Sequence, residues 1–114
     1  MLNQSIQLDR MFHALSDATR RHMVIQLSKA PTSVSELAKP LKMSMPAVLQ
    51  HLQVLEECGL IRSEKAGRVR TCHIEQKALS EAERWIVTLR ELHERRLDRL
   101  AVFLAEDKPP STKR

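Results

Sequence analysis

The sequence is poor in several residue types, and each scarcity narrows the possible functions. Aromatic residues make up 3% of the 114 residues and tyrosine is absent, so a stacking platform for single-stranded nucleic acid is not expected. Two glycines leave little material for tight hairpins, which favours a mainly helical fold. No apolar run approaches the roughly 20 residues of a transmembrane helix, and no signal-peptide pattern opens the chain. We therefore expect a cytoplasmic protein with no membrane partner.

The chemistry available to the chain is also limited. Cys58 and Cys72 form no CxxC motif. In a cytoplasmic protein they are expected to be two small buried thiols, and a redox switch across the core is the alternative. The sequence has no glycine-rich phosphate loop, no nucleophile paired with a base and no paired carboxylates. These absences argue against an enzyme.

What the sequence does have is an excess of basic residues. A chain of 114 residues is long enough for one domain with a modest core. Its formal net charge is +5 and its pI is about 9.7. Residues 1–60 contribute +1 and residues 61–114 contribute +4. This balance favours a polyanionic partner such as nucleic acid.

Apolar periodicity predicts three helices in the first third of the chain. Apolar residues recur at helical spacing over residues 4–15, which predicts a first helix. Asp17 can cap a second helix whose inward face holds Val24 and Leu27. A short third helix, "SELAKPL", is limited to about two turns by Pro40.

A longer fourth helix follows after a tight connection. Ser44 is a good N-cap, and Val48, Leu52 and Leu55 make a buried stripe before Gly59 ends the helix. A short helix, a turn of three to four residues and a longer capped helix are the layout of a helix-turn-helix.

The period changes to alternation after the fourth helix. "LIRSEKAGRVRTCHIE" predicts a β-hairpin with Gly67 at its turn, which is the wing of a winged helix-turn-helix. A long helix then covers residues 78–106, and residues 107–114 are expected to be a disordered tail. The predicted fold is mainly α, in the order α-α-α-α-β-β-α, with one winged helix-turn-helix domain over residues 1–106.

The last helix is too long for a domain of this size to cover. It carries leucines spaced by threes and fours, and its apolar face is expected to meet a second copy together with the first helix. We therefore predict a homodimer. Its expected interface residues are Leu8, Met11, Phe12, Ile86, Leu89, His93, Leu97 and Leu100.

Three segments, "ALSDATRRHMVIQL", "SVSELAKPLKMSMPAVLQHLQVLEECGLI" and "EKAGRVRTCHI", resemble in order and spacing the ArsR/SmtB family of bacterial winged helix-turn-helix repressors. The resemblance covers roughly residues 10–75. It implies a homodimer that is paired through its first and last helices and binds an inverted repeat in promoter DNA. It also implies release from the DNA when an inducer arrives.

The family's metal sites can be compared with this sequence residue by residue. The thiolate site looks like a Cys-x-Cys motif in the third helix, where residues 36–40 of this chain read "ELAKP". The site on the family's last helix needs Asp, His and Glu ligands, where this chain has Glu81, Glu83 and a lone His93 followed by Arg96. Zinc requires three or four converging ligands. We therefore expect no metal and no cofactor.

The fourth helix is expected to read DNA in the major groove. Gln50 and Gln53 can pair with adenine, and Met45 and Leu49 would suit thymine methyl groups if they are exposed. The alternative is that Met45 and Leu49 extend the core stripe. The candidate reading residues are Ser44, Met45, Pro46, Ala47, Leu49, Gln50 and Gln53.

Other residues are expected to contact the DNA backbone. The N-terminus of the fourth helix offers N–H groups to one phosphate, and basic residues surround the turn of the wing. These candidates are Ser33, Lys42, Lys65, Gly67, Arg68 and Arg70. Two polar residues have expected structural roles: His51 as a partly buried, hydrogen-bonded side chain, and Arg20 as an ion pair near Asp17.

Two functions from different classes follow from the sequence. The first is a homodimeric transcriptional repressor that binds double-stranded DNA. Its inducer, if it has one, is a small molecule or a protein. The second is a winged-helix interaction module whose long last helix docks a protein partner, with weak DNA binding. The wing arginines favour the first, and the apolar residues on the reading helix lend weight to the second.

Overall fold

The computed structural model describes residues 2–106 of the chain, with side chains from residue 6 onward. It divides into two units, Met1–Ala82 and Glu83–Arg114, which are described separately below. The tail predicted for residues 107–114 lies outside the described residues. No helix within the described part is long and apolar enough to cross a membrane.

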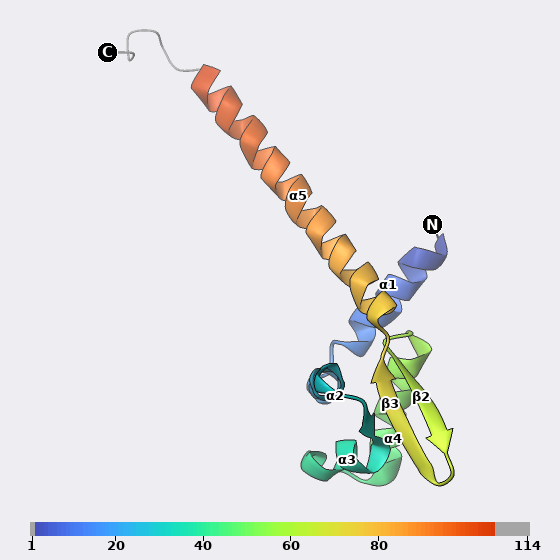
Figure 1. Cartoon of the computed structure of the whole chain (residues 1–114). Helices are drawn as coiled ribbons and strands as arrows, with labels where there is room; N and C mark the ends of the chain where they lie inside the picture. The colour runs from blue at the N-terminus through green and yellow to red at the C-terminus, as the bar shows by residue number, and fades with distance from the viewer. Residues whose placement is uncertain (1, 107–114) are drawn as a thin grey trace. The chain divides into compact units, whose positions relative to one another are not determined.

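The elements follow one another in the predicted order, with two additions (Figure 1). The first unit is mainly helical with a small antiparallel sheet, and it has the winged helix-turn-helix fold that the sequence predicts. The additions are the short strand β1 and the 3-10 turn η1. The elements are α1 (Leu2–Ala14), α2 (Ala18–Lys29), β1 (Thr32–Ser33), α3 (Val34–Ala38), η1 (Lys39–Leu41), α4 (Met45–Glu57), β2 (Ile61–Ala66), β3 (Val69–Ile74) and α5 (Gln76–Glu106).

The core of the first unit draws side chains from every helix and from the hairpin. Its fully buried larger side chains are Met11, Met23, Val48, Leu52, Leu55, Cys58, Leu60 and Cys72. Two predictions need correction. Met11 is 0% exposed, so it packs in this core and cannot supply surface to a dimer interface. Met23, and not Val24, is the fully buried partner of Leu27 on α2, while Val24 packs at the edge of the core.

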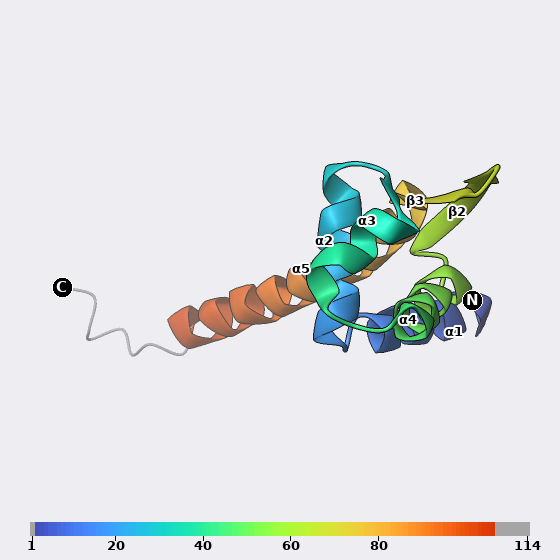
Figure 2. The ribbon, with the colours of Figure 1, turned by 90° about the horizontal axis from the view of Figure 1, so that it is seen from below.

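Helices α2, α3 and α4 each begin at a residue whose side chain caps the helix N-terminus. The carboxylate of Asp17 accepts a hydrogen bond from the Arg20 N–H at 3.0 Å, and the Ser33 hydroxyl accepts one from the Glu36 N–H at 3.2 Å. Ser44 caps α4 in the same way. Lys42 has a φ of +51°, a left-handed conformation that reverses the chain between η1 and α4. Figure 2 looks nearly along α4 and shows the hairpin of β2 and β3 extending to one side.

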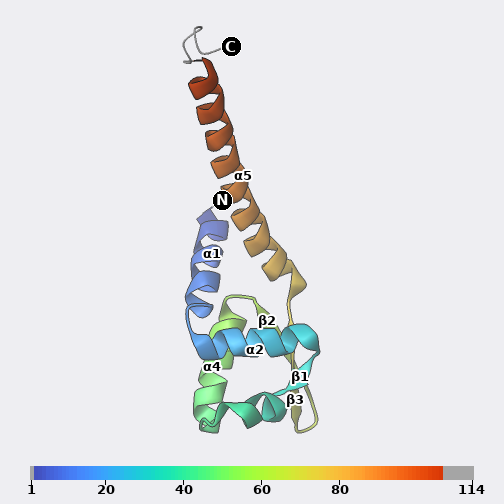
Figure 3. The same cartoon turned by 90° about the vertical axis from the view of Figure 1, so that its left-hand side faces the viewer.

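The sheet has three antiparallel strands in the order β1-β3-β2. In the hairpin, Ile61 lies opposite Ile74 and Lys65 opposite Arg70, with Gly67 at the turn in a left-handed conformation (φ +62°). The third strand was not predicted. β1 links α2 to α3 and pairs with β3 through Thr32 and Cys72 (Figure 3). It joins the start of α3 to the wing.

The second unit consists of the part of α5 from Glu83 to Glu106. This segment has no glycine or proline and runs as one uninterrupted helix (Figure 1). Most of its large apolar side chains are about half exposed, and Val87 is half-buried. The exposed ones are Trp85, Ile86, Leu89, Leu92, Leu97, Leu100, Val102, Phe103 and Leu104.

Candidate nucleic-acid interface

The two faces of α4 differ sharply in burial. Val48, Leu52 and Leu55 are fully buried, as their spacing predicts. Met45 and Leu49 lie one helical turn apart and are 43% and 38% exposed. The alternative that they extend the core stripe is therefore wrong. The remaining candidate readers, Pro46, Gln50 and Gln53, lie on the same exposed side or at its margin, and Ala47 is half-buried.

The start of α4 offers fewer N–H groups than the sequence suggests. Pro46 has none, and the N–H of Ala47 is already bonded to the Ser44 hydroxyl at 3.3 Å. The Val48 N–H bonds to the Ser44 carbonyl. Most of the first turn is thus satisfied within the protein, so a phosphate near this end would depend on side chains. Lys42, exposed two residues before the Ser44 cap, is the nearest cation in sequence.

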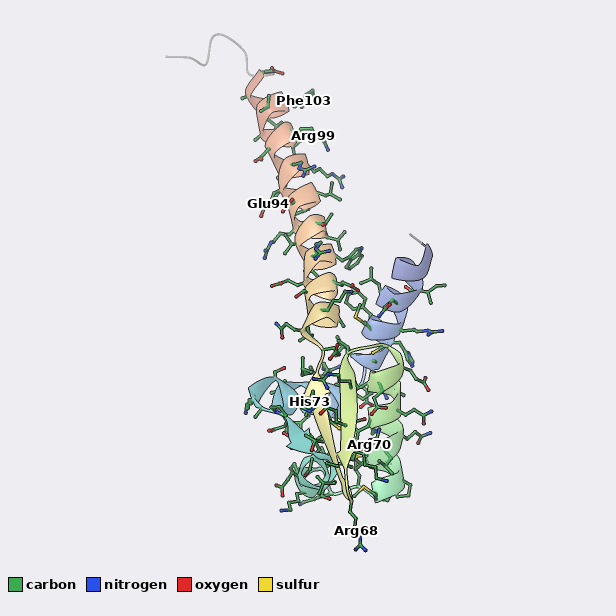
Figure 4. The ribbon with its side chains drawn as sticks, turned by 45° about the vertical axis from the view of Figure 1, so that its right-hand side comes forward. Arg68, Arg70, His73, Glu94, Arg99 and Phe103 are labelled. Carbon is green, nitrogen blue, oxygen red and sulfur yellow. The ribbon has the colours of Figure 1, made fainter. Side chains whose placement is uncertain are left out.

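The wing carries its basic residues in two different settings. Lys65 and Arg68 are exposed beside the turn, and Figure 4 shows Arg68 projecting beyond the end of the hairpin. Arg70 instead pairs with the carboxylate of Glu56 on α4, and its Nε donates to the Ser63 hydroxyl at 3.1 Å. Ser63 also donates to Glu56. Arg70 therefore ties the wing to α4, a role that the sequence analysis did not foresee.

A cleft of about 750 Å³ lies between the reading helix, the start of α3 and the wing. Its lining combines cations with apolar and hydroxyl side chains, and no described residue among the lining is acidic. The lining residues are Ser33, Val34, Ser35, Leu49, Ser63, Lys65, Arg68, Val69 and Arg70. The cleft thus brings together four predicted contacts, one from the reading helix and three from the wing, with the predicted backbone contact Ser33.

Four of these lining residues were missed by sequence reasoning, among them Ser63 on β2, which bonds to Arg70 and Glu56. Val34 opens α3, and Val69 opens β3 with more than half of its side chain exposed. Ser35 follows the Ser33 cap. The sequence does carry a signal for Val69, because this valine stands between Arg68 and Arg70 at the tip of the predicted hairpin.

Gln53 is partly occupied within the protein. Its side-chain amide donates to Glu57 Oε1 at 3.0 Å on the exposed surface of α4. Gln50 lies three residues before it and is also exposed. Of the two glutamines predicted to pair with adenine, Gln53 would have to break this hydrogen bond to contact a base in full. Gln50 is therefore the better candidate.

Arg20 of α2 and His51 of α4 link these two helices to the end of α1. The Arg20 guanidinium donates to the Ala14 carbonyl at 2.7 Å and to His51 Nδ1 at 3.1 Å. Arginine has only donors, so His51 Nδ1 must accept, which places the ring proton on Nε2. The prediction of a partly buried, hydrogen-bonded His51 is confirmed. The backbone N–H of Arg20, which bonds to the Asp17 carboxylate, is the main cause that lowers the pKa of Asp17. The Arg20 side chain does not form the predicted ion pair with Asp17 and instead bonds to the end of α1.

The two cysteines are buried and unbridged. Burial is the main cause that raises the pKa of both thiols, which disfavours the reactive thiolate. Within residues 2–106 no group of three His, Cys, Asp or Glu side chains could hold a metal ion.

The residues predicted for a dimer interface fall into both units. In α1, Leu8 is half-buried and Phe12 is 38% exposed. In the second unit, His93 and Leu97 line a surface hollow together with Arg96, Arg99 and Leu100. Ile86 and Leu89 lie earlier on α5, about half exposed.

Comparison with known proteins adds an independent line of information. Residues 17–63, which contain the helix-turn-helix, match the family described as bacterial regulatory protein, arsR family. The chain is 42% identical over 72 residues to the HTH-type transcriptional regulator Rv2034 of Mycobacterium tuberculosis, an alignment that covers 63% of this chain and 67% of that protein.

Two solved structures are similar over most of the chain. A crystal structure of an ArsR family transcriptional regulator has 46% sequence identity and a TM-score of 0.75, covering 79% of this chain and 93% of that one. An ArsR-like transcriptional regulator from Rhodococcus sp. RHA1 has 32% identity and a TM-score of 0.77, covering 89% of this chain and 95% of that one.

Proposed function

Because this chain belongs to the ArsR family of bacterial winged helix-turn-helix transcriptional regulators, we propose that it is a homodimeric repressor that binds an inverted repeat in promoter DNA. As a family member it is a DNA-binding regulator of transcription. The repressor activity, the dimer and the inverted repeat are the proposal. A protein with this task would work on chromosomal DNA in the cytoplasm.

The observation that carries the proposal is the cleft beside α4. It places Leu49 of the reading helix and the cations Lys65 and Arg68 on one concave surface without an acidic lining residue among those described. An α-helix fits the major groove of B-DNA, and a wing beside it can reach the flanking backbone. Cations at the wing neutralise phosphates and release counterions, which gives affinity without sequence preference.

The half-exposed apolar side chains of α5 support the homodimer. A monomer would leave the stripe that includes Ile86, Leu89, Leu97 and Leu100 in water. A second copy would cover this surface with the same residues, as a two-fold interface requires. Dimers of helix-turn-helix proteins present two reading helices to half-sites about one helical turn of DNA apart. Sedimentation as a monomer at micromolar concentration would contradict the dimer.

We propose that control of this regulator does not run through a metal. The sequence positions of the family's ligand sets hold Ala38 at the end of α3, Pro40 in η1, and Arg96 three residues after His93 in α5. An arginine so close to a ligand position would repel a cation. The inducer, if there is one, is a small molecule or a protein.

The test is fluorescence anisotropy on two duplexes of equal length, one from upstream of its own gene and one shuffled. Each is titrated at several salt concentrations, with and without chelator. We expect the upstream duplex to bind at least about 10³-fold more tightly, with no effect of chelator. Loss of binding in chelator would contradict metal independence, while equal binding of both duplexes would contradict a sequence-specific repressor.

A protein-interaction module is the second candidate, and the exposure of Met45 and Leu49 is the observation that favours it. Exposed apolar side chains close to one another often mark protein contacts. In that case both duplexes would bind weakly and alike, with a salt slope as the only signature of DNA binding.

A further inference from the structure

We propose that Met45 and Leu49 recognise the C5 methyl groups of pyrimidines in the major groove, with thymine as the natural source, and that this contact sets the sequence preference of α4. The inference rests on the proposed function and deepens it, because it names what the reading surface recognises.

The first argument is the placement of the two side chains. Met45 is the first residue of α4 and Leu49 lies one turn later on the same side, away from the buried residues Val48 and Leu52. They are more exposed than any core residue of the unit, at the end of the helix that enters the groove in this fold. Apolar surface at this position favours a partner that presents apolar groups.

The second argument is the charge around them. Leu49 shares its cleft with the exposed cations Lys65 and Arg68, and the lining residues include no carboxylate. The partner must therefore combine negative charge with apolar groups at short range. In the major groove, phosphates supply the charge, and the thymine C5 methyl is the apolar group displayed on the base edges.

The third argument is the hydrogen-bonding capacity that the two glutamines of α4 have left for DNA bases. Gln53 already donates to Glu57, so part of its hydrogen-bonding capacity is used within the helix. Gln50 can pair with adenine N6 and N7. Since adenine pairs with thymine, a run of A·T pairs would satisfy Gln50 and the two apolar side chains together.

The test begins with a duplex selected for binding from a random-sequence pool by the full-length protein. Each thymine of the selected half-site is then replaced by uracil, which removes one methyl group and leaves base pairing intact. Loss of one buried methyl should weaken binding by about fourfold. We expect this loss at one or two positions in each half-site.

Alanine variants of the protein show which side chain contacts each thymine methyl group. Leu49→Ala should bind the thymine duplex more weakly and become insensitive to uracil at one position, and Met45→Ala should do the same at another. Gln50→Ala is the matched control, because it should lose affinity and yet keep the full sensitivity to uracil. Both apolar residues are exposed, so circular dichroism should show all three variants folded.

A further arm separates the two sources of the methyl group. At each sensitive position, the T·A pair is replaced by C·G and by 5-methylcytosine·G. If the methyl group alone is read, 5-methylcytosine restores part of the affinity that C·G loses. If 5-methylcytosine gives no recovery while uracil still weakens binding, thymine itself is read.

Two failures remain distinguishable. A selected duplex that binds equally well with uracil at every position contradicts the inference and leaves the proposed function intact. A selection that returns no preferred sequence contradicts sequence-specific binding itself, and the inference with it.

Discussion

The hairpin carries four strong cations, and its tip and its strands use them differently. At the tip, Lys65 and Arg68 are exposed and have no carboxylate partner within the described residues. On the strands, Arg62 pairs with Glu64 and Glu75, and Arg70 pairs with Glu56 of α4. Arg70 thus links the wing to α4, while Arg62 pairs within β2 and with the residue that follows β3. The tip is the part with charge to offer to a phosphate.

The difference follows from neighbours and not from residue type. Arg68 and Arg70 stand two positions apart in sequence, yet Arg70 meets a carboxylate contributed by a helix, while Arg68 extends beyond the turn (Figure 4). An arginine already paired inside the protein must give up that pair to bind a phosphate. Three predictions test this division, from the largest expected effect to the smallest.

The double substitution Lys65→Ala/Arg68→Ala should have the largest effect on DNA binding. The binding constant falls with salt concentration to a power of about 0.9 for each phosphate contact. The loss of two contacts should therefore weaken binding by about 30-fold near 0.15 M salt. We expect this loss on specific and shuffled duplexes alike, with a salt slope smaller by about 2. Anisotropy titrations at four salt concentrations measure both quantities. Loss of sequence preference at an unchanged slope would contradict the assignment of the tip.

Arg70→Ala should act on stability instead. Removal of the guanidinium breaks a partly buried ion pair and the bond to Ser63, which should lower the free energy of unfolding by about 1 kcal/mol. Urea denaturation measures this change, with Arg68→Ala as the control, expected within about 0.5 kcal/mol of the unsubstituted chain. An Arg70→Ala protein of normal stability with a reduced salt slope would show that Arg70 belongs with the tip.

Ser63→Ala should have the smallest effect. It removes the hydroxyl between Arg70 and Glu56 but leaves their ion pair in place. We expect a loss of about 0.5 kcal/mol in the same denaturation experiment, with no change in the salt slope. A loss as large as that of Arg70→Ala would mean that the serine, and not the ion pair, fixes the wing.

Local signals in the sequence were sufficient for most of the fold. The caps Asp17 and Ser44, the buried stripe of α4 and the turn at Gly67 all depend on residues within a few positions of one another. Periodicity and capping report such short-range relationships directly. The helix-turn-helix and the hairpin were therefore predicted, and the family comparison confirms the resemblance.

The errors concern relationships over long distances in the sequence. β1 has two residues, too few for any alternation, and it exists because β3 offers an edge. Met11 shares its helical stripe with Leu8 and Phe12, and only the packing of α1 against the rest of the core, including α4, shows which of them is enclosed. The partner of Arg70 is likewise on another element. For the candidate site, residue types were predictable but their partners were not.

Amide chemical-shift mapping with the selected duplex tests the central claim most directly, since that claim is that α4 and the wing tip bind one duplex together. We predict that the backbone amides of Met45, Leu49, Gln50, Lys65 and Arg68 shift in a single titration with the same midpoint. Shifts confined to α5, or a wing tip that does not respond while α4 does, would contradict the account.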